Sequence, residues 1–351
     1  MSVVARSFAK INIGLRIGAR RDDGFHELRT LYQTVALYDT IRVETGRGVG
    51  IEIFSRDPKV PTDESNTCWR IAERVLKALK VRTKVRITIE KSLPVQGGLG
   101  AASSNAVVTM LAMEKALKRK LTPEDRLRVA SEVGSDLPLF LIGGTVLGTG
   151  RGEQVYSMQD LPAIPCVIAT PDIGVSTPAA FAAWDRAAAG LESRAFEDRD
   201  LENRDSENPE VEKRSIPAKK LTAAATSATI NTFSQSLYGW QNGCFSPTGV
   251  PDKGWDRAET MLLDLVRAGI ENDFESVVFP MYPAIREVKR VLERNGSGYA
   301  SLSGSGSTVY GFFKEHGEAV RAARALNERE IPARATMTLP RRRYWKELFQ
   351  R

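Results

Sequence analysis

The segment 84–118 constrains the fold of this chain more than any other. Residues 84–90 (KVRITIE) alternate apolar and polar side chains, with valine and isoleucines on one face, which is typical of a half-buried strand. A glycine-rich stretch follows at 92–107 (SLPVQGGLGAASSNAV), and apolar positions at helical spacing then run to about Lys118. The sequence therefore predicts a strand, a glycine loop and a helix in direct succession.

A loop of this kind can bind an anion. Glycine lets backbone N–H groups approach the anion closely, and a helix N-terminus adds unpaired N–H groups and a positive dipole end. The turn and its donors would come from Gly97, Gly98, Gly100, Ser103 and Ser104. The loop is neither a Walker motif, which needs Gly-Lys-Ser/Thr, nor the dinucleotide fingerprint. From these residues alone, a phosphate loop and a glycine turn with a serine cap are equally good interpretations.

Composition excludes several classes of protein. With 42% apolar and 26% charged residues, the 351-residue chain is neither collagen-like nor wholly disordered. The longest apolar stretch, at 137–147, is too short for a membrane span, and the N-terminus has no signal-peptide pattern. Three scattered cysteines and two histidines predict free thiols and no zinc site. We therefore expect a cytoplasmic protein.

The chain is basic, with a net charge of +7 and a pI of about 9.3. Basic proteins bind nucleic acids, anionic membranes or anionic small molecules. The charge is spread out, and the one dense cluster, 341–343, is best interpreted as part of a solvated terminal helix. We therefore expect a small anionic substrate, with neither nucleic acid nor membrane as a partner. The sequence leaves a homodimer open.

Periodicity and turn residues predict the remaining elements. Strands are expected at 3–9, 11–18, 35–45, 49–54, 144–150, 165–170, 299–303, 307–313 and 333–338. Helices are expected at 66–79, 123–134, 178–189, 257–294 and 317–327. Residues 191–215 contain nine acidic and five basic side chains and almost no large apolar ones. They predict a mobile insertion at about 190–256.

Several motifs occur in an order that resembles the GHMP kinases, the family of galactokinase, homoserine kinase and mevalonate kinase. The glycine loop is similar to that family's nucleotide loop, SFAKINIGL at 7–15 to its N-terminal motif, and LSGSGSTVYGFF at 302–313 to its C-terminal glycine motif. RRDDGFHEL at 20–28 and GSDLPLF at 134–140 resemble one branch of the family, whose substrate carries a cytidine diphosphate. Each motif alone is weak, and their order makes the match specific.

The resemblance implies an α+β, two-domain GHMP kinase fold with the active site in the cleft between the domains. The N-terminal domain, 1–170, would be ribosomal protein S5 domain 2-like and would hold the nucleotide loop. The C-terminal domain, 171–351, would be ferredoxin-like α+β and would carry the insertion. The implied reaction is phosphoryl transfer from ATP to an alcohol, with Mg²⁺ offsetting phosphate charge.

Two catalytic residues are implied by the resemblance. Asp136 matches the family's base or orienting carboxylate, and Lys10 matches the lysine beside it, which would keep the carboxylate ionised. Without the resemblance, Asp136 is best interpreted as a turn residue before Pro138, and Lys10 as a solvated lysine on a strand.

The implied ATP-binding residues form one segment: Pro94, Val95, Gln96, Gly97, Gly98, Leu99, Gly100, Ala101, Ala102, Ser103 and Ser104. The family is usually richer in glycine where this chain has Gln96, Ala101 and Ala102. Alanine would be strained at a positive φ but is preferable to glycine inside a helix. We therefore expect Ala101 and Ala102 to lie in the first helical turn. The sequence suggests no protein ligand for the metal.

Asn12, Phe25 and His26 are the implied substrate-binding residues. An aromatic ring and an imidazole after Gly24 can stack on a base and bond its edge, and Asn12 would lie near the transferred group. The alternatives are a core Phe, a surface His and an edge-strand amide. Residues 304–306 form a second glycine loop, either beside the first or serving only close packing.

Two rival functions are weaker. A non-catalytic metabolite sensor with a kinase fold predicts decay of the reacting residues, whereas Lys10, Asp136 and the loop serines are all present. A serine hydrolase is disfavoured because no GxSxG motif occurs.

Overall fold

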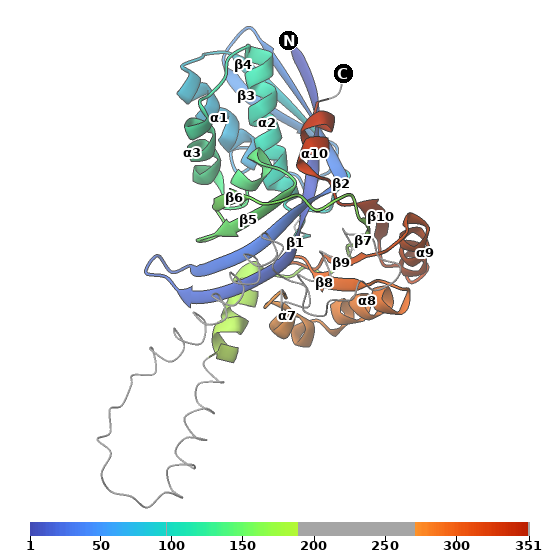
Figure 1. Cartoon of the computed structure of the whole chain (residues 1–351). Coiled ribbons are helices and arrows are strands. Elements are labelled where there is room, and N and C mark those ends of the chain that lie inside the picture. The colour runs from blue at the N-terminus through green and yellow to red at the C-terminus, as the bar shows by residue number, and fades with distance from the viewer. Residues whose placement is uncertain (96, 189–270, 350–351) are drawn as a thin grey trace, which may run out of the picture.

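A computed structural model of the protein organises the chain around two sheets (Figure 1). It describes residues 1–95, 97–188 and 271–349. The expected insertion at about 190–256, the first part of the helical region predicted from 257, and Gln96 lie outside the described residues.

The first sheet has the strand order β3-β4-β2-β5-β6, and β1 pairs with β2. Its strands are β1 (Ser2–Arg20), β2 (His26–Gly46), β3 (Gly50–Ser55), β4 (Lys84–Glu90), β5 (Thr145–Thr149) and β6 (Gln154–Ser157). The expectation of two separate N-terminal strands was wrong, because β1 is continuous. Its register against β2 shifts between Phe8 and Ala9 and between Asn12 and Gly14, and such bulges break the alternation of side chains.

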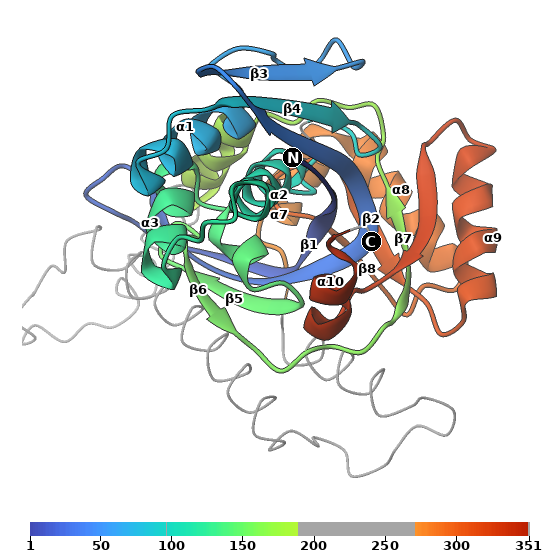
Figure 2. The same ribbon diagram turned by 90° about the horizontal axis from the view of Figure 1, so that it is seen from above.

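Helices pack on one face of this sheet, which curves around α2 (Figure 2). They are α1 (Thr67–Leu79), α2 (Ala101–Leu117), α3 (Pro123–Val133) and the short 3-10 helix η1 (Pro138–Leu141). The side chains of Asn66 and Thr122 cap α1 and α3 by accepting backbone N–H bonds. Helix α2 is buried on nearly all sides, and it begins at Ala101, as the alanines in the loop predict.

The second sheet has the order β10-β7-β9-β8. Its strands are β7 (Pro165–Ala169), β8 (Tyr299–Leu302), β9 (Val309–Phe312) and β10 (Ala333–Met337). Its helices are α7 (Glu275–Met281), α8 (Pro283–Arg294) and α9 (His316–Asn327), and residues 177–188 are also helical. Strand β7 already belongs to the second sheet, whereas we place the domain boundary after residue 170, and that boundary stays a prediction.

The end of the chain returns to the first sheet as α10 (Arg341–Glu347), which lies beside α2 and β1 in Figure 1. The expected terminal helix is present, but it is solvated on one side only. Tyr344 is fully buried and its hydroxyl donates to the Phe140 carbonyl at 2.8 Å. Arg341 donates to the carbonyls of Gly143 and Thr145. The basic run therefore includes side chains that fasten the helix to the segment after Asp136.

Among the described residues, no helix combines the length and the apolar character needed to cross a bilayer. Cys68 and Cys166 are free and buried, as expected, and Cys244 lies outside the described residues. Burial raises the pKa of the Cys68 thiol to about 12, so this thiol stays protonated at neutral pH.

Candidate active site

The first glycine loop, residues 97–100, connects the end of β4 to the start of α2. Gly98 has φ +82° and Gly100 has φ +66°, a region that favours glycine. A Cβ on Gly100 would lie 3.0 Å from Lys10 Cγ and 3.0 Å from the Phe140 ring. The loop thus needs glycine both for its backbone path and for the close approach of Lys10.

The second glycine loop, residues 304–306, packs directly on the first together with its flanking residues 303, 307 and 308. A Cβ on Gly98 would lie 2.6 Å from the Ser303 carbonyl oxygen, and one on Gly306 would lie 2.9 Å from Gly98 Cα. Ser303 Oγ donates to the Gly98 carbonyl at 3.2 Å, and Thr308 Oγ1 donates to the Gly97 carbonyl. Both interpretations of the second loop therefore hold, because it lies beside the first loop and packs closely on it.

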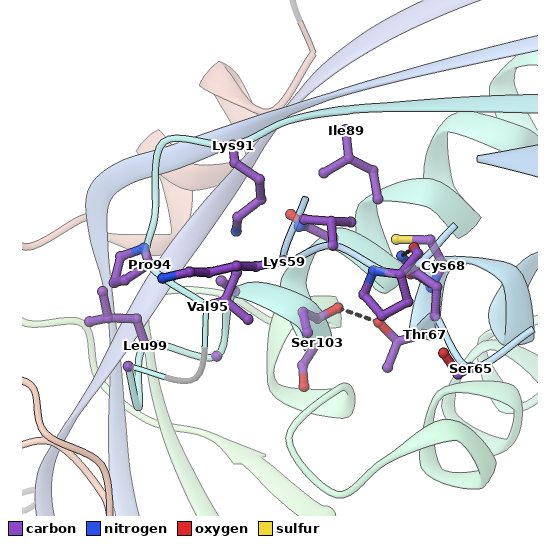
Figure 3. Close-up of a pocket in the computed structure, with 18 of the residues that line it drawn as sticks. Lys59, Ser65, Thr67, Cys68, Ile89, Lys91, Pro94, Val95, Leu99 and Ser103 are labelled. Atoms are coloured by element: carbon purple, nitrogen blue, oxygen red, sulfur yellow. Dashed lines mark hydrogen bonds between the residues drawn. The ribbon is translucent and has the colours of Figure 1, made fainter. Parts of the chain in front are cut away.

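A pocket of about 320 Å³ opens on the other side of the first loop (Figure 3). Its lining joins the loop to the start of α1 and the end of β4, and includes Val60, Asn66, Thr67, Lys91, Pro94, Val95, Ser103 and Asn105. Lys59 and Lys91 extend toward Pro94 and Val95 (Figure 3). Lys59 places a positive charge at a glycine-lined pocket, which favours an anionic ligand, whereas the almost buried Lys91 ammonium is paired with Asp39.

The two loop serines have different environments. Ser103 lines the pocket, whereas Ser104 is fully buried and its hydroxyl accepts from the Ser7 hydroxyl at 2.8 Å. The structure therefore leaves Ser103 as the serine that faces a ligand, while Ser104 holds α2 against β1.

A buried aspartate binds the chain before and after the first glycine loop. Asp39 is fully buried and accepts bonds from the backbone N–H groups of Ser92 at 2.7 Å and Leu93 at 2.8 Å. It also accepts from Asn105 Nδ2 at 3.0 Å and from the Lys91 ammonium. Because a carboxylate only accepts, it fixes the orientation of the Asn105 amide, and Asn105 Oδ1 is left without a hydrogen-bond partner among the described residues. Asn105 lines the pocket, so a ligand donor can satisfy this oxygen.

The reacting end lies where β1 passes the turn between α3 and η1. Lys10 Nζ is 3.4 Å from Asp136 Oδ2, although the two residues are far apart in the sequence. The lysine is 4% exposed, whereas the aspartate side chain is 35% exposed. The Lys10 backbone N–H donates to the Leu99 carbonyl at 2.9 Å, which ties this strand position to the first glycine loop. The structure brings together all three parts that the motifs predict.

Two further side chains hold this pair. Asn12 Oδ1 accepts from Lys10 Nζ at 2.7 Å, while Asn12 Nδ2 donates to Thr30 Oγ1 at 2.7 Å. The Tyr32 hydroxyl donates to Asp136 Oδ1 at 3.1 Å, and Lys10 Nζ lies 5.4 Å from the centre of the Tyr32 ring. Burial first, and then the Asp136 charge, raise the pKa of the Tyr32 phenol well above its usual value, so it remains a donor.

The other end of the site begins at the β1–β2 hairpin. His26 is buried, and its Nε2 lies 2.8 Å from Asp185 Oδ1. Its ring stacks on Phe181 with centroids 5.1 Å apart and an interplanar angle of 11°. Phe25, in contrast, is 54% exposed. An exposed ring beside a buried imidazole is suited to a flat heteroaromatic ligand.

Sequence reasoning missed several of these residues. Phe181 and Asp185 come from an alanine-rich helix with no motif, and only the fold brings that helix to the hairpin. Lys91 had a usable signal, because it directly follows the clearest strand and precedes the loop. Tyr32 had no such signal, since its role depends on a hydrogen bond to Asp136 that forms only in the folded chain.

The described residues contain no group of three or more His, Cys, Asp or Glu side chains arranged to hold a metal ion. The features that fit a nucleotide are the glycine loop, the pocket lysine Lys59 and the unpaired Asn105 Oδ1. They fit a phosphate-bearing ligand that would bring its own counter-ion.

Comparisons with known proteins agree with this arrangement. The family model of the GHMP kinases N terminal domain matches residues 66–144, and that of the GHMP kinases C terminal matches residues 258–331. A 4-diphosphocytidyl-2-C-methyl-D-erythritol kinase of Solibacter usitatus is 31% identical over 92% of this chain and 85% of its own length. The Geobacter sulfurreducens kinase of the same name is 31% identical over 94% of this chain and 97% of its own length.

Solved structures give the same result. A crystal structure of 4-(cytidine 5'-diphospho)-2C-methyl-D-erythritol kinase matches with a TM-score of 0.65 and 25% identity, covering 96% of this chain and 99% of the other. A homoserine kinase from Cytophaga hutchinsonii shares the fold, with a TM-score of 0.64 and 19% identity over 97% of this chain and 95% of the other.

The chain belongs to the GHMP kinase family, and it is a phosphotransferase. Within that family it groups with the 4-diphosphocytidyl-2-C-methyl-D-erythritol kinases, whose name its relatives from several bacteria share.

Proposed function

We propose that this protein transfers a phosphoryl group from ATP to the 2-hydroxyl of 4-diphosphocytidyl-2-C-methyl-D-erythritol, a step of the non-mevalonate isoprenoid pathway. The observation that carries the proposal is the approach of Lys10 to Asp136 beside the first glycine loop. The relatives that match most of the chain carry the name of this kinase.

In this proposal, ATP lies along the segment from Pro94 to Ser104. Its adenosine occupies the 320 Å³ pocket, and its phosphates pass over the loop, whose far side touches Lys10. Backbone N–H groups and the N-terminus of α2 face the phosphates. Mg²⁺ would neutralise phosphate charge there, and the described residues supply no cluster of acidic ligands for it.

At the reacting end, Asp136 accepts the proton of the 2-hydroxyl while Lys10 stabilises the negative charge on the attacking oxygen. Asp136 is the more exposed of the two and can reach a substrate, while the buried Lys10 is held in place by Asn12. Both ends of the Asn12 amide are already bonded. We therefore assign Asn12 first to positioning Lys10, and its expected contact with substrate requires one of these bonds to be exchanged.

Phe25 and His26 bind the cytosine, with Phe181 and Asp185 supporting the imidazole. The exposed Phe25 ring offers a stacking face for the base. Sister kinases that act on homoserine or mevalonate have no base to hold, so this end of the site discriminates between the candidate substrates.

The test is coupled ADP release with the cytidine substrate, and separately with homoserine and with mevalonate. We expect turnover only with the cytidine substrate, and phosphorus NMR should locate the new phosphate on the 2-oxygen. Asp136→Asn should lower kcat by on the order of 10²–10⁴-fold without loss of the fold. Turnover with a sister substrate alone, or full activity of Asp136→Asn, would refute the proposal.

A further inference from the structure

Arg151 lies between the two ends of the site. Its guanidinium carbon is 5.0 Å from the centre of the exposed Phe25 ring, a cation–π contact at the base end. The next residue, Gly152, approaches the reacting end, because a Cβ there would lie 2.6 Å from the Tyr32 hydroxyl and 3.8 Å from Asp136 Oδ1. Arg151 and Gly152 together thus connect the aromatic hairpin to the carboxylate.

The guanidinium has donors to offer. Its side chain is 35% exposed, and its acidic neighbour, Glu153, lies 3.7 Å away from Nε, beyond hydrogen-bond distance. Glu153 instead accepts from the backbone N–H of Arg151 at 2.7 Å, which fixes the turn. Within the described part of the chain, Arg151 Nε is buried without a hydrogen-bond partner, so a ligand would be bound by the two Nη groups.

Two other arginines near the hairpin form shorter ion pairs. Arg16 pairs with Asp273 at 2.6 Å, and Arg21 pairs with Glu27 at 2.8 Å. The Arg151 charge is the smallest of several causes that lower the pKa of Asp23, of which a backbone hydrogen bond from Phe25 is the largest.

We infer that Arg151 binds the diphosphate that links the cytidine to the acceptor alcohol. The inference rests on the proposed function, in which the base lies at Phe25 and His26 and the reacting hydroxyl lies at Asp136. A substrate that spans these points must pass its two phosphates between them, where Arg151 lies. A guanidinium matches phosphate oxygens with two parallel N–H bonds, whereas a lysine offers only a point charge.

The experiment compares inhibition by CDP and by cytidine in the full-length wild type and in Arg151→Gln. Both inhibitors carry the base, but only CDP carries the diphosphate. Charge-assisted hydrogen bonds of this strength predict that the ratio of the cytidine Ki to the CDP Ki falls by about 10- to 100-fold in the variant. The cytidine Ki itself should change little. Arg151→Lys should give an intermediate ratio, because it keeps the charge and loses the fork.

Other outcomes overturn the inference. An unchanged ratio, with both inhibitors weakened equally, would mean that Arg151 only supports the Phe25 ring. A higher KM for ATP with an unaltered CDP Ki would mean that it serves the nucleotide donor. Failure of the proposed function is recognised separately, because the wild type itself would then neither bind CDP nor turn over the cytidine substrate.

Discussion

The two ends of the site are built differently. At the reacting end, Lys10 is 4% exposed and donates to Asn12, while Tyr32 holds the free side of Asp136. At the base end, Phe25 is 54% exposed, and Asp185, which contacts His26, has a 43% exposed side chain. Transfer of a phosphoryl group requires fixed geometry, whereas capture of a flat base requires an accessible face. Changes at the reacting end should therefore act on kcat, and changes at the base end on KM.

Besides Asp136→Asn, the largest effect is expected from Lys10→Met, which keeps the length of the side chain and removes its charge. We expect kcat to fall by on the order of 10²–10³-fold, since a buried cation no longer stabilises the attacking oxygen. The KM for the cytidine substrate should stay near the wild-type value. Steady-state kinetics with a circular-dichroism check of the fold measure both. A change confined to KM would remove the distinction between the two ends.

Gly98→Ala tests whether the reacting end depends on the interlocked loops. The substitution places a methyl group 2.6 Å from the Ser303 carbonyl at φ +82°, so we expect a loss of stability of roughly 1–3 kcal/mol and a higher KM for ATP. Thermal unfolding and ATP titration measure these quantities. Gly46→Ala is the matched control, because a Cβ there meets nothing within 4 Å. Equal losses in both variants would show that the interlock has no special role.

The sequence predicted local structure better than contacts between segments that are far apart in the chain. Local signals worked well: the alternation at 84–90, the Thr122 cap and the alanines at 101–102 each gave the observed element. The approach of Lys10 to Asp136 needed the family resemblance, because no periodicity relates distant segments. The terminal helix α10 was predicted, but its packing through Tyr344 and Arg341 was missed, since these side chains bond carbonyl groups that only the folded chain presents.

Tyr32→Phe sharpens the comparison at the reacting end. The ring remains, so the packing against Gly148 should be kept, but the hydroxyl beside Gly152 is removed and Asp136 Oδ1 loses its donor. We expect kcat to fall by about tenfold, with little change in KM, because the carboxylate loses a hydrogen bond that holds it in position.

Combining Tyr32→Phe with Asp136→Asn tests whether the Tyr32 hydroxyl acts through Asp136. If the hydroxyl acts through Asp136, then Tyr32→Phe should have little further effect in an Asp136→Asn protein. Tyr299→Phe is the matched control, because that hydroxyl donates to the Ile13 carbonyl at 3.3 Å, on the same strand as Lys10. The same loss of kcat in either the Asp136→Asn background or the control variant would make the effect a general one of packing.

The smallest effect is expected from Asp185→Asn at the base end. The substitution keeps an oxygen that can accept from the His26 ring and removes only the charge. Because the Asp185 side chain is 43% exposed, its charge contributes little, and the KM for the cytidine substrate should rise by no more than about fivefold at unchanged kcat. Salt at about 0.5 M should reduce the difference further, since solvent ions screen exposed pairs. A fall in kcat as large as that of Lys10→Met would contradict this prediction. It would mean that the position of the His26 imidazole controls the position of the acceptor hydroxyl, so that the base end affects the chemistry as strongly as the reacting end does.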